Sequence, residues 1–272
     1  MRVWLTVLLM VLIQGCGGSN DTASVDVPIT PPAVVIPSPA LLSNAMASCG
    51  IWSQHLPDFR SPYYLQRQQR WVVMGSSSAF GAGASSYANS WAGQLKDLAA
   101  TYGAEVVNIA RGGYTTYHAL GSACSINNMR PQPDLAHNID LAIELGADLV
   151  ILSFPSNDAA SNFPAEETAF NLLYMRARLA DKSIPLILLG AQPRNMSAAK
   201  QRLLIELDSL LKPRFSPCLV ELYSHLVDNA GNLAAQYDSG DGVHFNDSGH
   251  AVVFSKLKAL ITDRSNNSCF SG

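Results

Sequence analysis

From Trp71 onward, short apolar runs alternate with helical segments, and this alternation constrains the fold more than any other feature of the chain. Each run has the length of a buried strand, and each following segment repeats its apolar residues at helical spacing. Strands that alternate with helices of about ten to fifteen residues form a parallel sheet with helices on both faces. We therefore predict an α/β fold, a three-layer α/β/α sandwich around a five-stranded parallel sheet. The predicted strands are 71–74, 106–110, 149–153, 184–191 and 219–222, and the predicted helices are 87–102, 135–145, 166–179, 198–211 and 251–261.

The composition is that of a globular protein that does not bind nucleic acid. Of the 272 residues, 48% are hydrophobic and 14% are charged, which separates the chain from the disordered class. Its net charge of -3 provides no positive field for a phosphate backbone, and its lysine and arginine residues are scattered.

The N-terminus has the features of an export signal. Arg2 precedes an apolar run, Val3 to Ile13, that is too short to cross the roughly 30 Å hydrocarbon core of a bilayer as a helix. The sequence Ile13-Gln14-Gly15-Cys16 resembles a bacterial lipobox. This resemblance implies a signal peptide over residues 1–15 and a lipid anchor at Cys16, which holds the protein on the bacterial cell envelope, at the outer membrane where there are two. An ordinary secretory signal is the alternative.

Residues 16–48 are rich in proline and small polar residues, which favour extended conformers of roughly 3 Å per residue. We predict a semi-rigid tether here, followed by a folded domain over residues 49–272. The domain contains four cysteines, an even number in a compartment that export makes oxidising. Two disulfides are expected, with all three pairings open and four buried thiols as the alternative. The cysteines are Cys49, Cys124, Cys218 and Cys269.

A run of small and polar residues, Gly75 to Gly83, directly follows the first predicted strand. A strand-to-helix turn is where an exposed nucleophile or an anion-binding loop is found. The run fits neither the dinucleotide fingerprint G-x-G-x-x-G nor the nucleophile elbow G-x-S-x-G. Alone it is compatible with an ordinary turn, so its interpretation depends on the other strand ends.

Three more polar motifs follow later in the alternating pattern. Each is weak alone, because a loop asparagine is usually a turn residue, but their order and spacing are specific. Over roughly residues 70–262 the chain resembles the SGNH or GDSL hydrolase family, whose four sequence blocks place serine, glycine, asparagine and histidine on successive loops. The blocks correspond here to Gly75-Ser76-Ser77-Ser78, Asn108-Ile109-Ala110-Arg111-Gly112-Gly113, Pro155-Ser156-Asn157-Asp158 and Asp241-Gly242-Val243-His244.

The resemblance implies a flavodoxin-like sheet and a serine esterase mechanism. Ser77 takes the position of the nucleophile, His244 that of its general base, and Asp241 that of the carboxylate that orients the histidine. The backbone N–H groups of Ser77 and Gly113 and the side-chain amide of Asn157 take the positions of the oxyanion-hole donors. This chemistry requires no metal ion or organic cofactor.

Three residues depart from the family pattern. Ser76 stands where aspartate is usual, and Ala110 and Pro155 each replace a glycine. None of them occupies a triad or oxyanion-hole position. We therefore expect these departures to affect substrate class and rate rather than the type of reaction.

Other residues near the blocks have weaker assignments. Asp158 is expected to cap or brace the third loop. Arg111 and Arg194 are expected to be solvated loop residues, with binding of an acidic or sugar-rich substrate as the alternative. Aromatic residues near the second and last blocks are candidates for a pocket wall, namely Tyr114, Tyr117, His118 and Tyr237.

The sequence thus predicts an exported serine esterase that acts on a small-molecule or carbohydrate ester. We expect it to remove short acyl groups, such as O-acetyl groups on carbohydrate. A lipase or thioesterase of the same family is one alternative. A non-catalytic, carbohydrate-binding lipoprotein on the same fold is another. No metal site is expected, because Asp247 and His250, which follow His244, lack the spacing of metal ligands.

Overall fold

A five-stranded parallel sheet forms the centre of the protein in a computed structural model, which describes residues 47–50, 68–127, 129–154, 156–263, 265 and 269–270. The strand order is β2-β1-β3-β4-β5, and every neighbouring pair is parallel. This is the doubly wound order of flavodoxin-like folds, and it confirms the predicted sheet. The strands are β1 (Arg70–Gly75), β2 (Glu105–Asn108), β3 (Leu149–Ser153), β4 (Leu186–Leu189) and β5 (Leu219–Val220).

Both faces of the sheet are buried. Successive residues of a strand point to opposite faces, and in β1 the residues Trp71 and Val73 belong to one apolar cluster while Val72 and Met74 belong to another. A strand buried on both faces is apolar at every position. For this reason the central strands appear in the sequence as continuous apolar runs.

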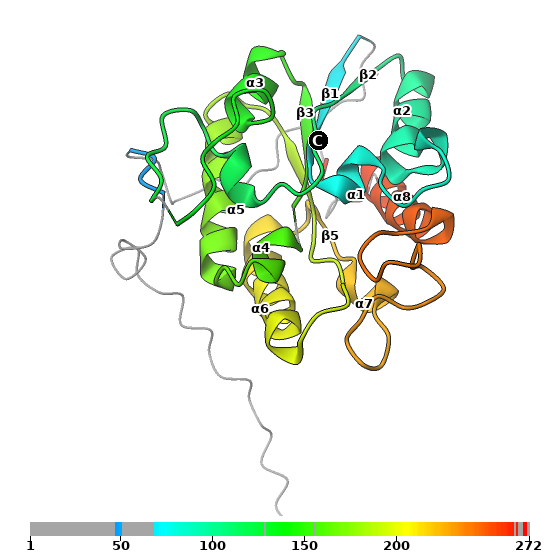
Figure 1. The fold of residues 1–272 in the computed structure, drawn as a ribbon. Coiled ribbons are helices and arrows are strands. Elements are labelled where there is room, and N and C mark those ends of the chain that lie inside the picture. The colour runs from blue at the N-terminus through cyan, green and yellow to red at the C-terminus, as the bar shows by residue number, and fades with distance from the viewer. Residues whose placement is uncertain are drawn as a thin grey trace, which may run out of the picture. The chain divides into compact units, whose positions relative to one another are not determined.

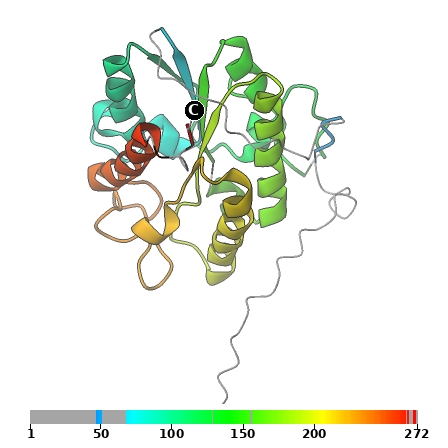
Figure 2. The ribbon, with the colours of Figure 1, turned by 180° about the vertical axis from the view of Figure 1, so that it is seen from behind.

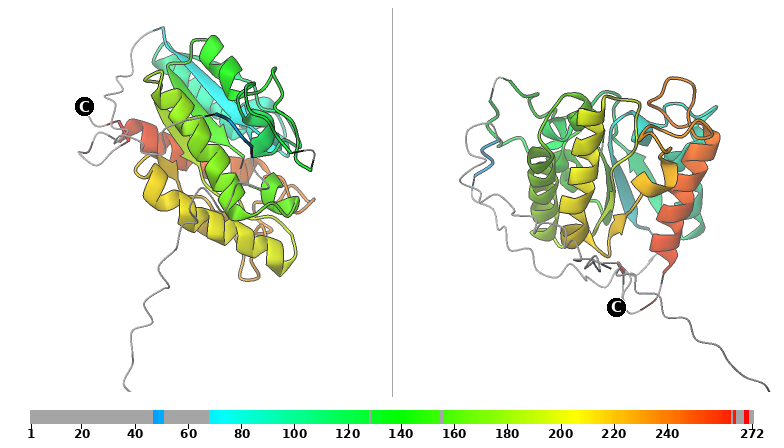
Figure 3. Two further views of the ribbon diagram at one scale, coloured as in Figure 1. Left: turned by 90° about the vertical axis from the view of Figure 1, so that its left-hand side faces the viewer. Right: turned by 90° about the horizontal axis from the view of Figure 1, so that it is seen from below.

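Helices cover each face and make the fold three layers deep. One face is covered by α2 (Trp91–Thr101) and α8 (Asp247–Thr262), and the other by α3 (Ile139–Glu144), α5 (Ala165–Ala180) and α6 (Ala198–Phe215). Figure 1 shows the two groups on opposite sides of the sheet, and Figure 2 shows the same separation from behind. The right-hand view of Figure 3 shows the sheet between them. The predicted three-layer architecture is confirmed.

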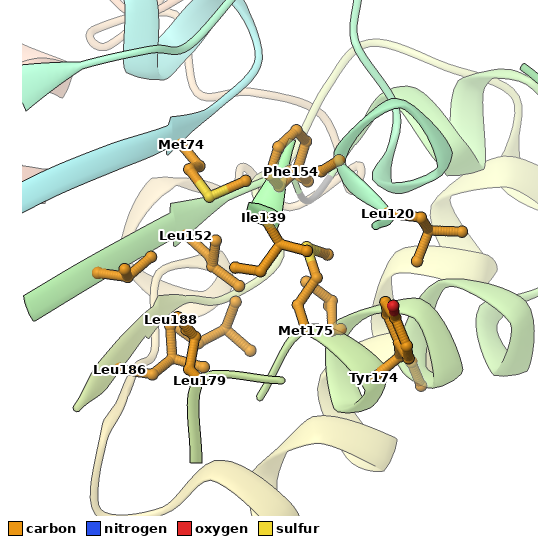
Figure 4. Packing of buried hydrophobic residues seen from close by; sticks show 14 of the residues in the cluster. Met74, Leu120, Ile139, Leu152, Phe154, Tyr174, Met175, Leu179, Leu186 and Leu188 are labelled. Atoms are coloured by element: carbon orange, nitrogen blue, oxygen red, sulfur yellow. The ribbon is translucent and has the colours of Figure 1, made fainter. Parts of the chain in front are cut away.

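The core under α3 and α5 shows how the layers are held together. Met74, Leu152 and Leu188, from three adjacent strands, lie opposite Ile139 and Met175 (Figure 4). All five side chains are at most 1% exposed. Burial of each such side chain stabilises the folded state by about 1.5–3 kcal/mol.

Polar caps determine where several helices begin. The predicted helix 87–102 is divided at Ser90, whose side chain accepts the Gly93 N–H, into the 3-10 turn η2 (Tyr87–Asn89) and α2. α8 begins earlier than predicted, because Asn246 caps it by accepting the Gly249 N–H. Asn138 caps α3 in the same way, so that helix begins later than predicted. The early start of α8 places the last sequence block directly before this helix.

Three short helices follow strands of the sheet and carry or support the candidate site residues. They are α1 (Ser77–Phe80) after β1, η3 (Thr116–Ala119) after β2 and α4 (Asn157–Ala160) after β3, while a fourth short helix, α7 (Tyr223–Leu226), follows β5.

Two disulfides are present, and they select one of the three predicted pairings. Cys49–Cys124 joins the 47–50 segment to the loop after η3, and Cys218–Cys269 joins the start of β5 to the segment after α8. Their sequence separations are 75 and 51 residues. In the chain-entropy model, bridges that close loops of this length each stabilise the fold by about 4 kcal/mol.

The predicted signal peptide, Cys16, most of the tether and Pro155 lie outside the described residues. Their assignments therefore remain predictions. No helix in the described part of the chain combines the length and the hydropathy needed to cross a membrane.

Candidate active site

The candidate site lies where the loops after several strands meet. Ser77 follows β1, Gly113 lies in the loop after β2, and Asn157 begins α4 after β3 (Figure 1). His244 and Asp241 come from the loop before α8. In open parallel sheets, the carboxyl ends of the strands are where sites form.

His244 lies between Ser77 and Asp241. Its Nε2 atom is 2.9 Å from Ser77 Oγ, and its Nδ1 atom is 2.5 Å from Asp241 Oδ2. Because a carboxylate only accepts hydrogen bonds, Nδ1 of the neutral ring carries the proton, and Nε2 accepts from the Ser77 hydroxyl. This is the arrangement in which a base activates a serine.

Asp241 is held by its own turn. Its Oδ1 atom accepts the N–H groups of Val243 and His244, both at 2.8 Å. Partial burial alone would raise the pKa of the Asp241 carboxyl, but the hydrogen bonds from His244 and Val243 outweigh it and lower the pKa to about 2. The carboxylate is therefore ionised near neutral pH and can stabilise a protonated imidazole.

Ser77 is placed by a sharp turn from β1 into α1. A Cβ atom at Gly75 would lie 2.5 Å from Ser153 O and 2.6 Å from Ala79 Cβ, so only glycine fits there. At this turn the Ser76 N–H donates to the Ser153 carbonyl at 3.0 Å. The Ser77 carbonyl accepts the N–H of Gly81 at 3.0 Å, which ends α1. The half-buried Ser77 side chain thus lies at the start of α1.

The loop that carries His244 packs directly on the segment after α1. Gly83 has a φ of 90°, and a Cβ there would lie 2.3 Å from Phe245 O and 2.8 Å from His244 Cβ. Ser85 strengthens this contact, since its N–H and hydroxyl donate to the Asp247 carboxylate at 2.8 and 2.6 Å. These contacts bring the histidine to the serine.

His250 has a structural role beside this contact. It is fully buried, its Nδ1 accepts the Trp91 N–H at 3.3 Å, and its Nε2 donates to the Ala82 carbonyl at 3.1 Å. Burial lowers the pKa of His250, so the ring is neutral in this position. It ties α8 to the start of α2 and to the turn after α1. Within the described ranges, no group of three or more histidine, cysteine or acidic residues has the arrangement of a metal site.

The side chain of Asn157 is held by hydrogen bonds from both of its ends. Its Nδ2 donates to the Tyr114 carbonyl at 2.9 Å, and its Oδ1 accepts from Arg194 at 3.0 Å. Since a carbonyl only accepts and a guanidinium only donates, both partners require the same amide orientation. The second N–H of Nδ2 has no partner among the residues that the structure describes, so this hydrogen can be donated to a substrate.

The loop after β2 lies next to Ser77. A Cβ built on Gly112 would be 3.9 Å from Ser77 Cβ, whereas one built on Gly113 would meet no heavy atom within 4 Å. Gly113 also has a φ of 80°, a backbone conformation that glycine adopts readily. The backbone at Gly113 is therefore open to an approaching substrate.

Asp158, predicted to brace the third loop, links α4 to η3 on the side of the site that holds Asn157. It is 1% exposed, and it accepts the Thr116 N–H at 3.0 Å and the Thr116 hydroxyl at 2.5 Å. Burial raises the pKa of the Asp158 carboxyl to about 6, although the hydrogen bonds from Thr116 oppose the shift. The brace joins α4 to η3, the elements on either side of the Asn157–Tyr114 contact.

The aromatic candidates have different positions. Tyr117 is fully buried in the core and its hydroxyl donates to Glu167 at 2.5 Å, so its prediction as a pocket wall was wrong. Tyr237 is half-buried against the apolar cluster under α8. Tyr114 and His118 are half-buried next to Gly113 and stack with their ring centroids 4.2 Å apart.

The two arginines also differ. Arg111 is 59% exposed at its side chain and lies 3.7 Å from the Asp134 carboxylate, which agrees with the predicted solvated residue. Arg194 is half-buried and bonded to Asn157, so the same prediction was wrong for Arg194. Sequence reasoning missed this contact because the loop after β4 belongs to none of the four blocks.

A cavity of about 500 Å³ opens beside α1. Two exposed apolar side chains line it, Phe80 at 61% and Tyr87 at 42% exposure, and Phe80 lies one helical turn after Ser77. Sequence reasoning missed this cavity too, because apolar residues next to a turn look like core residues. The full lining is Phe80, Gly81, Ala82, Ala84, Ser86, Tyr87 and Asn108.

Comparisons with known proteins identify the family of the chain. Residues 73–252, more than half of the chain, match the model of the GDSL-like Lipase/Acylhydrolase family. No curated protein matches the sequence.

Several solved structures are similar to the chain. A GDSL-like lipase from Bacteroides thetaiotaomicron has 21% identity and a TM-score of 0.51, with 71% of this chain and 87% of that chain covered. A lipase/acylhydrolase from Enterococcus faecalis has 17% identity and a TM-score of 0.52, with 71% and 95% covered. The psychrotrophic esterase EstA from Pseudoalteromonas sp., inhibited by monoethylphosphonate, has 15% identity and a TM-score of 0.51, with 71% and 97% covered. At these identities the likeness shows a common fold.

Proposed function

The chain belongs to the GDSL-like lipase/acylhydrolase family and is a carboxylic ester hydrolase, and we propose that Ser77, His244 and Asp241 carry out the hydrolysis through an acyl-enzyme. The observation that supports these roles is the continuous series of hydrogen bonds from Asp241 through His244 to Ser77, at 2.5 and 2.9 Å.

The proposed reaction has two halves. In the first, Ser77 Oγ attacks the ester carbonyl while His244 Nε2 takes its proton, and His244 then gives that proton to the leaving alcohol. In the second, a water molecule loses a proton to His244 and attacks the acyl group on Ser77. The Ser77 Oγ–acyl bond then breaks, His244 returns the proton to Ser77 Oγ, and the acid is released. Asp241 stabilises the imidazolium in both halves.

The tetrahedral intermediates carry a negative oxygen that needs preset donors. The proposed donors are the backbone N–H groups of Ser77 and Gly113 and the Nδ2 amide of Asn157. The open backbone at Gly113 and the unused N–H of Asn157 support these roles. Loss of one such donor typically lowers kcat by about 10²–10³-fold.

For the substrate, we propose short acyl esters, O-acetyl groups on carbohydrate in particular. The family and the predicted location at the cell envelope support this substrate. The small residues next to the nucleophile, Ser76, Ser78 and Ala79, are buried and do not line the cavity beside α1. The cavity beside α1 favours a second candidate, an ester with a larger apolar acyl or aryl group, as in a lipase or thioesterase.

Location is part of the proposal. A lipid anchor at Cys16, with the tether over residues 16–48, would hold the enzyme at the cell envelope. The variant Cys16→Ala, expressed from the full chain in a bacterium, should leave the membrane fraction. If it stays there in the same amount, the anchor is not at Cys16.

Hydrolysis of p-nitrophenyl acetate, butyrate and octanoate tests the reaction. Ser77→Ala should lower kcat by on the order of 10⁶-fold, while Ser78→Ala, the same change one residue along, should keep most of the activity. Full activity in Ser77→Ala would refute the nucleophile. Preference for acetate supports the short acyl group, and preference for octanoate supports the second candidate.

A fluorophosphonate probe tests the non-catalytic alternative, since only an activated serine reacts with it. EstA, a similar structure, is inhibited by a phosphonate. Labelling in the native protein that is lost in Ser77→Ala supports the enzyme. A folded native protein that is not labelled supports the carbohydrate-binding lipoprotein.

A further inference from the structure

The loop after β4 touches both sides of the candidate site. Arg194 donates to Asn157 Oδ1 at 3.0 Å. The next residue, Asn195, donates its backbone N–H to the Gly242 carbonyl at 2.8 Å, within the turn that holds Asp241 and His244. The contact is close, since a Cβ on Gly242 would lie 2.4 Å from Asn195 Nδ2. Two consecutive residues thus join the oxyanion side to the acid–base side.

Arg194 occupies a position that is costly for a cation. Its side chain is half-buried, and among the described residues no carboxylate lies within 4.0 Å of its guanidinium. Burial lowers the pKa of Arg194, and the charge of Asp241 opposes the shift only in part. The direct partner is a neutral amide. A charge that loses hydration for such a contact contributes little to stability, so a functional reason for its position is needed.

We propose that Arg194 is a positioning residue, which holds the Asn157 amide in the orientation that stabilises the oxyanion. The guanidinium has only donors, so it keeps Oδ1 turned toward itself and Nδ2 turned toward the Tyr114 carbonyl and the substrate. Its positive charge also polarises the amide, which makes the second N–H of Asn157 a stronger donor. The inference rests on the proposed function, because it requires Asn157 to bind an oxyanion.

A double-variant cycle tests this role on p-nitrophenyl acetate, an uncharged ester. Arg194→Gln should lower kcat by about tenfold or more, the equivalent of one charge-assisted hydrogen bond, with little change in KM. Asn157→Ala should lose about 10²–10³-fold. If Arg194 acts through Asn157, the double variant should be no slower than Asn157→Ala alone. Losses that multiply in the double variant would overturn the proposal.

Further variants separate positioning from a structural role. Arg202→Gln, an exposed arginine on α6, is the matched control and should leave kcat and stability unchanged. Guanidinium ion at millimolar concentration should partly restore kcat in Arg194→Ala without restoring Asn157→Ala. Absence of rescue in a folded Arg194→Ala would count against the proposal. If the neutral variants do not fold, Arg194→Lys decides, because lysine also only donates and keeps the positive charge, so this variant should fold and keep most of its kcat. A folded lysine variant that loses as much kcat as Asn157→Ala overturns the proposal.

Two other outcomes are distinguishable. An Arg194→Gln variant with normal kcat on the uncharged ester, but a raised KM for an ester that carries a carboxylate, would show that Arg194 recognises substrate charge instead. Activity that survives Ser77→Ala would refute the proposed function itself, whatever Arg194 does.

Discussion

The two sides of the active site are held in place by different kinds of contact. The acid–base side is a single turn, in which Asp241 accepts the N–H groups of Val243 and His244 and orients the His244 ring. The oxyanion side is assembled from distant segments, since Asn157 contacts Tyr114 and Arg194, which are 43 and 37 residues away in the sequence.

Burial separates the two sides as well. The Asp241 side chain is 50% exposed, whereas Asp158, the brace of the oxyanion side, is 1% exposed. The pKa of Asp241 is lowered to about 2, and that of Asp158 is raised to about 6. A short exposed turn can thus be specified by a few neighbouring residues, whereas the buried side depends on the whole fold. Substitutions in the turn should change mainly the rate, and substitutions of the buried brace should change mainly the stability.

Asp241→Asn should have the largest effect on rate. Without the carboxylate, nothing fixes the Nδ1-protonated tautomer of His244 or stabilises its protonated form, so kcat should fall by about 10⁴-fold. Thermal stability at neutral pH should fall only modestly, because the half-exposed side chain makes a stabilising contribution that solvent screens. Kinetics with p-nitrophenyl acetate and thermal unfolding check both parts, with Asp97→Asn on the exposed face of α2 as the control. A large loss of stability would contradict the view that the turn is independent of the fold.

Gly83→Ala tests where that independence ends. The added Cβ would push against Phe245 O and His244 Cβ and displace His244 from Ser77. Misplacement by about 1 Å can cost roughly 100-fold in rate, so we expect kcat to fall by about 10–100-fold.

The matched control for this change is Gly146→Ala. Gly146 has a φ of 71°, close to the 90° of Gly83, but a Cβ there would meet no atom within 4 Å. Both variants should lose about 1 kcal/mol or more from backbone strain, and only Gly83→Ala should lose rate. Equal rates for the two variants would show that the contact at Gly83 does not position the histidine.

Asp158→Asn should have the smallest effect on rate and a distinct effect on stability. The pKa of Asp158 is about 6 in the folded state against 3.8 ordinarily, so the unfolded state binds fewer protons between these values. The native protein should therefore lose stability as pH rises from about 4 to 7, by about 3 kcal/mol from this group. The substituted asparagine cannot ionise, so the variant does not lose this stability. As pH rises from about 4 to 7, its free energy of unfolding should therefore increase relative to that of the native protein.

Denaturant unfolding of both proteins at pH 4 and pH 7 measures this change, and a difference that does not depend on pH would contradict it. Asp241→Asn provides the comparison with the opposite sign. The pKa of Asp241 is lowered to about 2, so its contribution to stability is present above about pH 4 and is lost as pH falls toward 2.

Much of the fold was predictable because its signals are local. Strand length and helical spacing identified the five strands and the main helices, and parallel pairing followed from their alternation. The errors lie at helix ends such as Ser90 and Asn246, where a side-chain cap competes with apolar spacing. Tyr117 could not be assigned, because an aromatic residue near a motif has the same appearance whether it lines a pocket or fills the core.

The sequence by itself determined the order of the four blocks, and with it the family, the sheet and the expected meeting of Ser77, Asp241 and His244. It determined these because strand ends of a parallel sheet lie at one edge, and because Asp241 and His244 share one turn. Only the tertiary structure decided the disulfide pairing, the cavity beside α1 and the contact of Arg194 with Asn157. Each of these depends on distances between segments far apart in the chain, and such distances are set by packing rather than by local sequence.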